Sequence, residues 1–325
     1  MSHELTTNTI TGRVEFAYRE SDGLPWHGLG QALPDTASID EWRVAAGMDW
    51  RIKRAKVRYP VAPDAVNDAS RYIEMPDQHV LFRSDNHNAL GIVSNKYKVV
   101  QPSEVIEFFR DIVKVGGLEL SAAGTIYGGQ RYWATAKIGE AAPVSVQDKI
   151  GGYLLISTSA DGSTATEVRR TTVRVVCRNT LALASKDKAS LRINHRSEFD
   201  PERVKQYMGI NEAAWEAFRH QMVRLAEKQL VCEEAEELAI SIIGGERDKV
   251  VTSTGFNNVM RLFTGAGAGS TFDGTYGTAY GLLNAFTEHV DHHARTRSEE
   301  NRFVSSQWGP GADLKQRALE VLADL

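Results

Sequence analysis

The sequence contains very little cysteine. Its 325 residues include only two, Cys177 and Cys232, which lie far apart and form no CxxC pair. A disulfide framework and a zinc site built from thiolates are therefore not predicted. Two isolated cysteines fit a reducing compartment, so we expect a cytoplasmic protein.

Long apolar runs and common signatures are also missing. The first residues lack a basic start followed by an apolar run, and no stretch reaches 18 uninterrupted apolar residues. Export and membrane insertion are therefore not expected. The glycine-rich run at 264–278 is not followed by Gly-Lys-Ser/Thr, which argues against a phosphate-binding loop. No repeat of 20–50 residues is present, which argues against solenoids and propellers.

The composition is that of a globular protein, with 42% hydrophobic and 25% charged residues. Strand-like segments dominate the first two thirds, and helical spacing dominates after residue 201. The pattern predicts an α+β fold in which an antiparallel sheet is flanked by helices and followed by a helical C-terminal part. We expect three regions: a flexible segment at 1–23, an α+β core at 24–200, and a mainly helical region at 201–325 with a glycine-rich loop at 264–278.

Several elements are predicted individually. Ser103 stands where a helix N-cap belongs, ahead of an apolar stripe, and a second helix is expected around 39–46. A helix is also expected to start at 179–185, and an amphipathic helix within 201–243 carries Trp215, Phe218, Met222 and Leu225. Strands are expected at 118–126, 130–138, 153–159 and 164–177.

The strand from Val168 to Cys177 is unusually rich in arginine. Alternation places Arg170, Arg174 and Arg178 on one face, and apolar side chains on the other. From residue 169 to 196 the chain has eight Lys/Arg and one acid, although its net charge is −4; Lys186, Lys188 and Arg192 belong to this run. Arginines two positions apart recur every ~6.6 Å, which suits a backbone-tracking groove for nucleic acid. A solvated sheet face that happens to carry arginines explains the same pattern.

A second basic run supports the nucleic-acid interpretation. It contains Arg51, Lys53, Arg54, Lys56 and Arg58. Trp133 is a candidate for stacking on a base, although aromatic side chains in strands more often belong to the core.

A rival interpretation places a divalent metal in the C-terminal part. Glu288 and His292 are spaced i, i+4, so they would share one face of a helix and offer two ligands. The same residues also fit the ordinary polar face of an amphipathic helix, and a metal site needs further ligands. No cofactor is predicted apart from this weak metal candidate.

Five stretches together resemble the phage/plasmid-like protein family built on a domain of unknown function, number 932. They are PWHGLG at 25–30, YKVVQPSE at 97–104, TSADGS at 158–163, TVRVVCRNTL at 172–181 and NAFTEHVDH at 284–292. The resemblance implies a role in the DNA metabolism of mobile elements and transfers no catalytic residue. The order of helix, antiparallel strands and basic strand is also similar to single-strand annealing proteins of the RecT/Redβ kind, which assemble into rings or filaments.

These observations favour a non-catalytic protein that binds or anneals single-stranded DNA in phage or plasmid recombination or replication, as a homo-oligomer. Two alternatives stay open. One is a metal-dependent enzyme acting on nucleic acid. The other is an adaptor that binds another protein through its acidic C-terminal helices.

Overall fold

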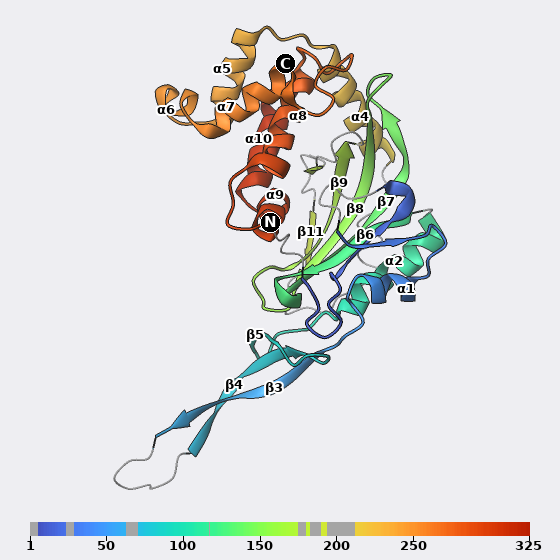
Figure 1. Cartoon of the computed structure of the whole chain (residues 1–325), viewed down its shortest axis with the longest axis vertical. Helices are drawn as coiled ribbons and strands as arrows, with labels where there is room; N and C mark the ends of the chain where they lie inside the picture. The colour runs from blue at the N-terminus through green and yellow to red at the C-terminus, as the bar shows by residue number, and fades with distance from the viewer. Residues whose placement is uncertain are drawn as a thin grey trace.

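The computed structural model describes residues 6–23, 29–62, 71–116, 118–174, 180–182, 190–193 and 212–325. Figure 1 shows three parts: a central twisted sheet, a group of C-terminal helices at one end of it, and a long two-stranded ribbon projecting from the other end. The fold is α+β, as the sequence predicts.

The central sheet has eight strands in the order β10-β9-β8-β7-β6-β1-β2, with β11 also paired to β9. Neighbours are antiparallel except β1 and β2, which are parallel, so the sheet is mixed where a purely antiparallel one was expected. The strands are β1 (Phe16–Arg19), β2 (Gln31–Leu33), β6 (Glu119–Ile126), β7 (Arg131–Pro143), β8 (Lys149–Ser159), β9 (Thr166–Arg174), β10 (Thr180–Ala182) and β11 (Ser190–Ile193).

One face of this sheet packs against α1 (Ile39–Ala45) and α2 (Pro102–Gly116). Tyr132 on β7 and Leu154 on β8 point to that side and join Phe108 and Phe109 of α2 in the main apolar core of the central sheet. Alternation then sends Trp133 and Leu155 to the opposite face, where Trp133 stacks on Phe303. Both faces of the middle strands are therefore covered.

The C-terminal part is helical. Phe218, Met222 and Leu225 are buried at helical spacing. They belong to a second apolar core that includes residues as far along the chain as Leu322. The helices are α4 (Glu212–Glu227), α5 (Cys232–Ile243), α6 (Arg247–Val251), α7 (Thr254–Arg261), α8 (Ala279–Glu288), α9 (Glu299–Trp308) and α10 (Pro310–Ala323), with π-helical turns η3 (Leu262–Ala266) and η4 (His289–His293). In the described part of the chain no helix has the length and apolarity needed to cross a membrane.

A second sheet of three strands forms the ribbon and its root. It consists of β3 (Ile52–Val61), β4 (Arg71–Arg83) and β5 (Ala89–Ser94), in that order. β5 pairs with β4 only from Gln78 toward the root, so beyond that point the described ribbon is two-stranded. A bulge between Lys56 and Arg58 separates the root from the distal part.

The structure corrects three expectations about elements. The segment 1–23, expected to be flexible, supplies β1, which pairs with β6 and buries Phe16. Helix α2 begins at Pro102, so Ser103 is not its N-cap; proline, which lacks an N–H, suits the first helical position. Thr180–Ala182 is a strand and not the start of a helix, because its backbone pairs in antiparallel orientation with the edge of β9.

Candidate nucleic-acid interface

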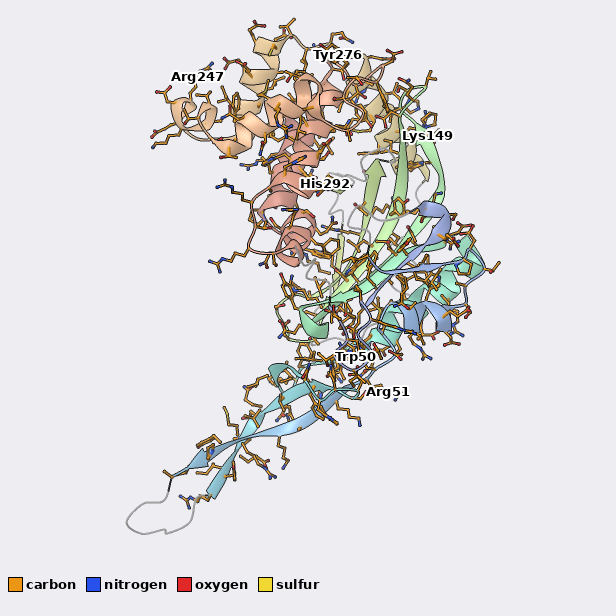
Figure 2. All side chains as sticks on the ribbon, viewed as in Figure 1. Trp50, Arg51, Lys149, Arg247, Tyr276 and His292 are labelled. Carbon is orange, nitrogen blue, oxygen red and sulfur yellow. The ribbon has the colours of Figure 1, made fainter. Side chains whose placement is uncertain are left out.

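The ribbon carries a cluster of exposed basic side chains. In β3, Lys53, Arg54, Lys56 and Arg58 are exposed and there is no acidic residue, while β4 adds exposed Arg71. Arg51, just before β3, is exposed as well. Figure 2 shows side chains projecting from both sides of the ribbon, with Arg51 at its root. The second basic run of the sequence is thus a solvent-facing cationic arm.

Charge on the arm is only partly neutralised. Glu74 of β4 pairs with Lys56 at 2.6 Å and with Arg58 at 3.5 Å, and the hydrogen bond from Lys56 lowers the pKa of that carboxyl. Lys53 and Arg71 form no ion pair with any other described residue. Since exposed pairs contribute little to stability, Lys56 and Arg58 can exchange Glu74 for a phosphate at small cost.

Two tyrosines stand out on the distal part of the ribbon. Tyr72 is 72% exposed and Tyr59 is 46% exposed, values that are unusual for aromatic side chains. An exposed ring beside a guanidinium offers a stacking surface together with a positive charge, which is the combination that binds single strands. These tyrosines were not among the predicted site residues, although their position next to the basic run was the available signal.

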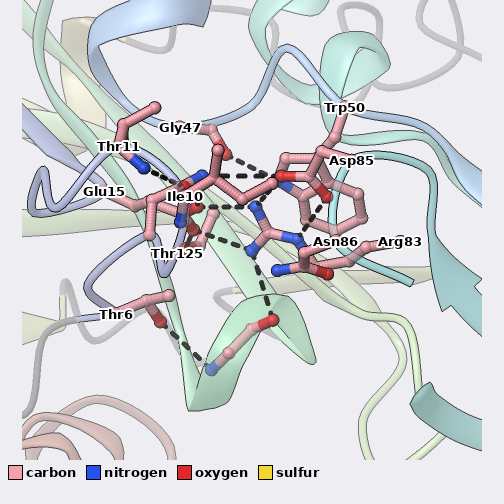
Figure 3. Close-up of polar contacts among 12 residues, drawn as sticks. Thr6, Ile10, Thr11, Glu15, Gly47, Trp50, Arg83, Asp85, Asn86 and Thr125 are labelled. Atoms are coloured by element: carbon pink, nitrogen blue, oxygen red, sulfur yellow. Dashed lines mark hydrogen bonds and ion pairs between the residues drawn. The ribbon is translucent and has the colours of Figure 1, made fainter. Parts of the chain in front are cut away.

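The ribbon is anchored at its root by a buried ion cluster, drawn in Figure 3. Arg83, the last residue of β4, is 1% exposed and binds Glu15 with two hydrogen bonds of 2.9 and 2.6 Å. It also donates to Asp85 at 3.0 and 2.7 Å, and its guanidinium lies 4.3 Å from the centre of the Trp50 ring. Thr125 of β6 donates to Glu15, so the cluster joins the ribbon to the central sheet.

The electrostatics of the cluster favour its charged form. Burial alone would lower the pKa of Arg83, but hydrogen bonds to Asp85 and Glu15 outweigh it and raise that pKa. Burial would likewise raise the pKa of Asp85, and the hydrogen bond and charge of Arg83 lower it instead. Gly129 allows this close packing, because a Cβ there would lie 2.7 Å from the Trp50 ring at a φ of +96°.

An open hollow of ≈ 260 Å³ lies beside the cluster. Its charged lining residues are Arg13, Glu15, Asp49 and Asp85, so acids outnumber bases. A phosphate group would meet net negative charge there, and the hollow is a poor place for nucleic acid.

The arginines predicted on β9 are divided between two faces. Arg170 lies opposite Leu154, on the side of the main core, and is partly buried; burial lowers its pKa. Arg169 lies opposite Leu155, on the side covered by α9, and donates to Gln307 at 3.0 Å. The described part of β9 is therefore not a wet arginine face backed by an apolar one, because both of its sides are packed.

The other predicted basic residues are only partly described. Arg192 on β11 is exposed and lies 3.6 Å from Glu167. Arg174 ends β9, opposite Ile150. Arg178, Lys186 and Lys188 lie outside the described residues, as does the side chain of Arg174. The structure therefore does not bring the two basic runs together within its described part.

Trp133 is closed to a base in this conformation. It is 7% exposed, and its ring centre lies 5.0 Å from that of Phe303 on α9. Within the described residues, the buried N–H groups of Trp133, Trp308 and Arg169 Nε have no hydrogen-bond partner, and burial lowers the pKa of Arg169. Stacking on Trp133 would first require α9 to move away.

The predicted metal pair does not form. Glu288 is 7% exposed and accepts a hydrogen bond from the backbone N–H of Ala268 at 2.9 Å, so it fastens the glycine-rich loop. The π-helical turn that follows brings His293, rather than His292, to 3.6 Å from Glu288, because residues five apart align in such a turn. Among the residues that the structure describes, no three potential ligands converge on a metal position.

Comparison with known proteins gives one match. The model of the family described as "Domain of unknown function (DUF932)" covers residues 89–308. The chain belongs to this family. Searches of curated proteins and of solved structures return no significant match.

The DUF932 match separates the ribbon from the rest of the protein. It begins at β5 and ends with α9, so it includes β9, Trp133 and Glu288. It leaves out β3 and β4, and with them all of the exposed arm. The arm thus precedes the segment that defines the family.

Proposed function

We propose that this protein binds single-stranded DNA and that the ribbon of β3 and β4 is the principal contact surface. One observation carries the proposal: an anchored ribbon, with Arg51 just before it, presents five exposed basic residues and two exposed tyrosines against two acids, Glu74 and Asp77. Phosphates bind such cations with release of counterions, and bases stack on exposed rings.

The location of the arm supports the same function. A ribbon that reaches away from the body touches a long polymer without requiring a cleft, and the hollow at its root is acidic. Arg170 and Arg192 are secondary contacts, because the first is partly buried and the second is near Glu167. The resemblance to phage/plasmid-like proteins suggests DNA recombination or replication as the process. Assembly into an oligomer would bring several weakly binding ribbons together and so increase the total affinity for DNA.

Fluorescence anisotropy with a labelled oligonucleotide at several salt concentrations tests the proposal. Replacing Lys53, Arg58 and Arg71 with glutamine should weaken binding at least about tenfold at low salt. It should also make the plot of log binding constant against log salt concentration less steep, by about 2. Each of the three lost phosphate contacts accounts for roughly 0.7 of this change. The matched control replaces Lys228, Lys249 and Arg295, which are exposed on the helical part, and changes the net charge equally.

Each result decides the proposal. Weakening by the ribbon variant alone supports it. Equal weakening by both variants would show that only the net charge matters. No binding of single strands by the unaltered protein at low salt would refute the function itself.

A further inference from the structure

The distal ribbon presents one arginine and one tyrosine on each of its faces, with Glu74 on the face of Arg58. The register pairs Arg58 with Glu74, Tyr59 with Ile73, Pro60 with Tyr72 and Val61 with Arg71. Directly opposed residues share a face, and successive residues alternate. Arg58 and Tyr72 therefore lie on one face, and Tyr59 and Arg71 lie on the other.

Both faces are open to solvent. Tyr72 and Tyr59 are 72% and 46% exposed, the Arg58 side chain is 60% exposed, and Arg71 is exposed. The third strand, β5, stops pairing at Gln78, before this part of the ribbon. A surface for one strand would need only one such face, with the other free to carry any polar residues.

We propose that the ribbon binds two strands of nucleic acid at once, one on each face, and thereby brings complementary strands together. This rests on the proposed function, to which it adds a second strand. Each face supplies one ring for stacking and one guanidinium for phosphate. The strands would lie on opposite sides of a sheet with its side chains, farther apart than the screening length of about 8 Å, so their repulsion is screened.

Stoichiometry separates this from a one-strand site. We expect the unaltered protein to bind two short oligothymidylates per chain at saturation, measured by calorimetric titration. The variant Arg58→Ala/Tyr72→Ala should bind one, and so should Tyr59→Ala/Arg71→Ala. The variants Tyr72→Phe and Tyr59→Phe keep the ring and should still bind two. Fluorescence energy transfer between complementary labelled strands measures their rate of annealing. In both alanine variants this rate should fall to the rate without protein.

Three results would overturn the two-strand proposal. The first is saturation of the unaltered protein at one strand per chain. The second is loss of all binding when either face is altered, with the unfolding transition unchanged. The third is tighter binding of a duplex of the same length, which would indicate that the ribbon enters a groove. All three differ from failure of the proposed function, in which the unaltered protein binds no strand.

Discussion

β8 and β3 are strands of similar length with opposite surroundings. Nine of the eleven residues of β8 are buried, against one of ten in β3. β8 lies between β7 and β9, and its faces pack against residues of α2 and α9, whereas β3 is an edge strand with only β4 beside it. The first strand therefore contributes to the core, and the second contributes a surface.

This difference shows which side chains stabilise the protein and which are available for binding. An isolated two-stranded hairpin is only marginally stable in water. The ribbon depends on its root, where Arg83 joins Glu15 and Asp85. The residues beyond the bulge add little to the core, which leaves them free to bind a partner. The largest stability effects should therefore come from the root and the central sheet, and the smallest from the distal ribbon.

The most damaging single change should be Arg83→Met. It leaves Glu15, 2% exposed, as a buried charge without its guanidinium, and removal of one partner of a buried ion pair costs about 3–5 kcal/mol. Urea unfolding measures the loss. The double variant Arg83→Met/Glu15→Gln should recover part of it, because it removes the unpaired charge as well.

Arg58→Met is the matched control for this change. Arg58 is exposed and its pairing with Glu74 is solvent-screened, so its loss should cost less than about 1 kcal/mol. Equal destabilisation by Arg83→Met and Arg58→Met would break the distinction between root and ribbon.

A smaller effect is expected when apolar side chains are shortened. Leu154→Ala on β8 empties a fully packed site and should cost about 2–4 kcal/mol. Ile73→Ala on the distal ribbon, where the side chain is only partly buried, should cost about 1 kcal/mol or less. Chemical denaturation of both variants compares them directly, and a larger loss for Ile73→Ala would show that the ribbon is packed by something not seen in the single chain.

The smallest effect concerns acid. The pKa of Asp85 is lowered in the folded protein, so its contribution to stability is present above its unfolded pKa, near 4, and is lost as the pH falls through the folded value. Asp85→Asn should destabilise the protein by about 1 kcal/mol at pH 7. The difference from the unaltered protein should shrink as the pH falls below about 4, the unfolded pKa of an aspartate, as followed by thermal unfolding in buffers of decreasing pH. A difference that stays constant with pH would contradict the role of this carboxylate.

Local pattern was sufficient for much of the fold. The apolar stripe ahead of Gly116 predicted α2, and alternation predicted β6 to β9 within a few residues. The i, i+4 spacing of Glu288 and His292 misled, because the chain changes to a π-helical turn at His289 that the spacing does not reveal. The contact that covers Trp133 comes from Phe303, 170 residues later in the chain, so it could not be predicted from the residues near Trp133 either.

The sequence by itself determined the secondary-structure types, the family and the existence of two basic runs, because these depend on composition and on residues close along the chain. Only the tertiary structure decided what the runs do. Arg169 and Arg170 lie on packed faces since β9 is paired along both edges. Arg169 contacts Gln307 and Trp308 of α9, and Arg170 shares its face with the buried Val168. Lys53, Arg58 and Arg71 stay in solvent since the ribbon projects away from the body, to which the Arg83 cluster joins only its root.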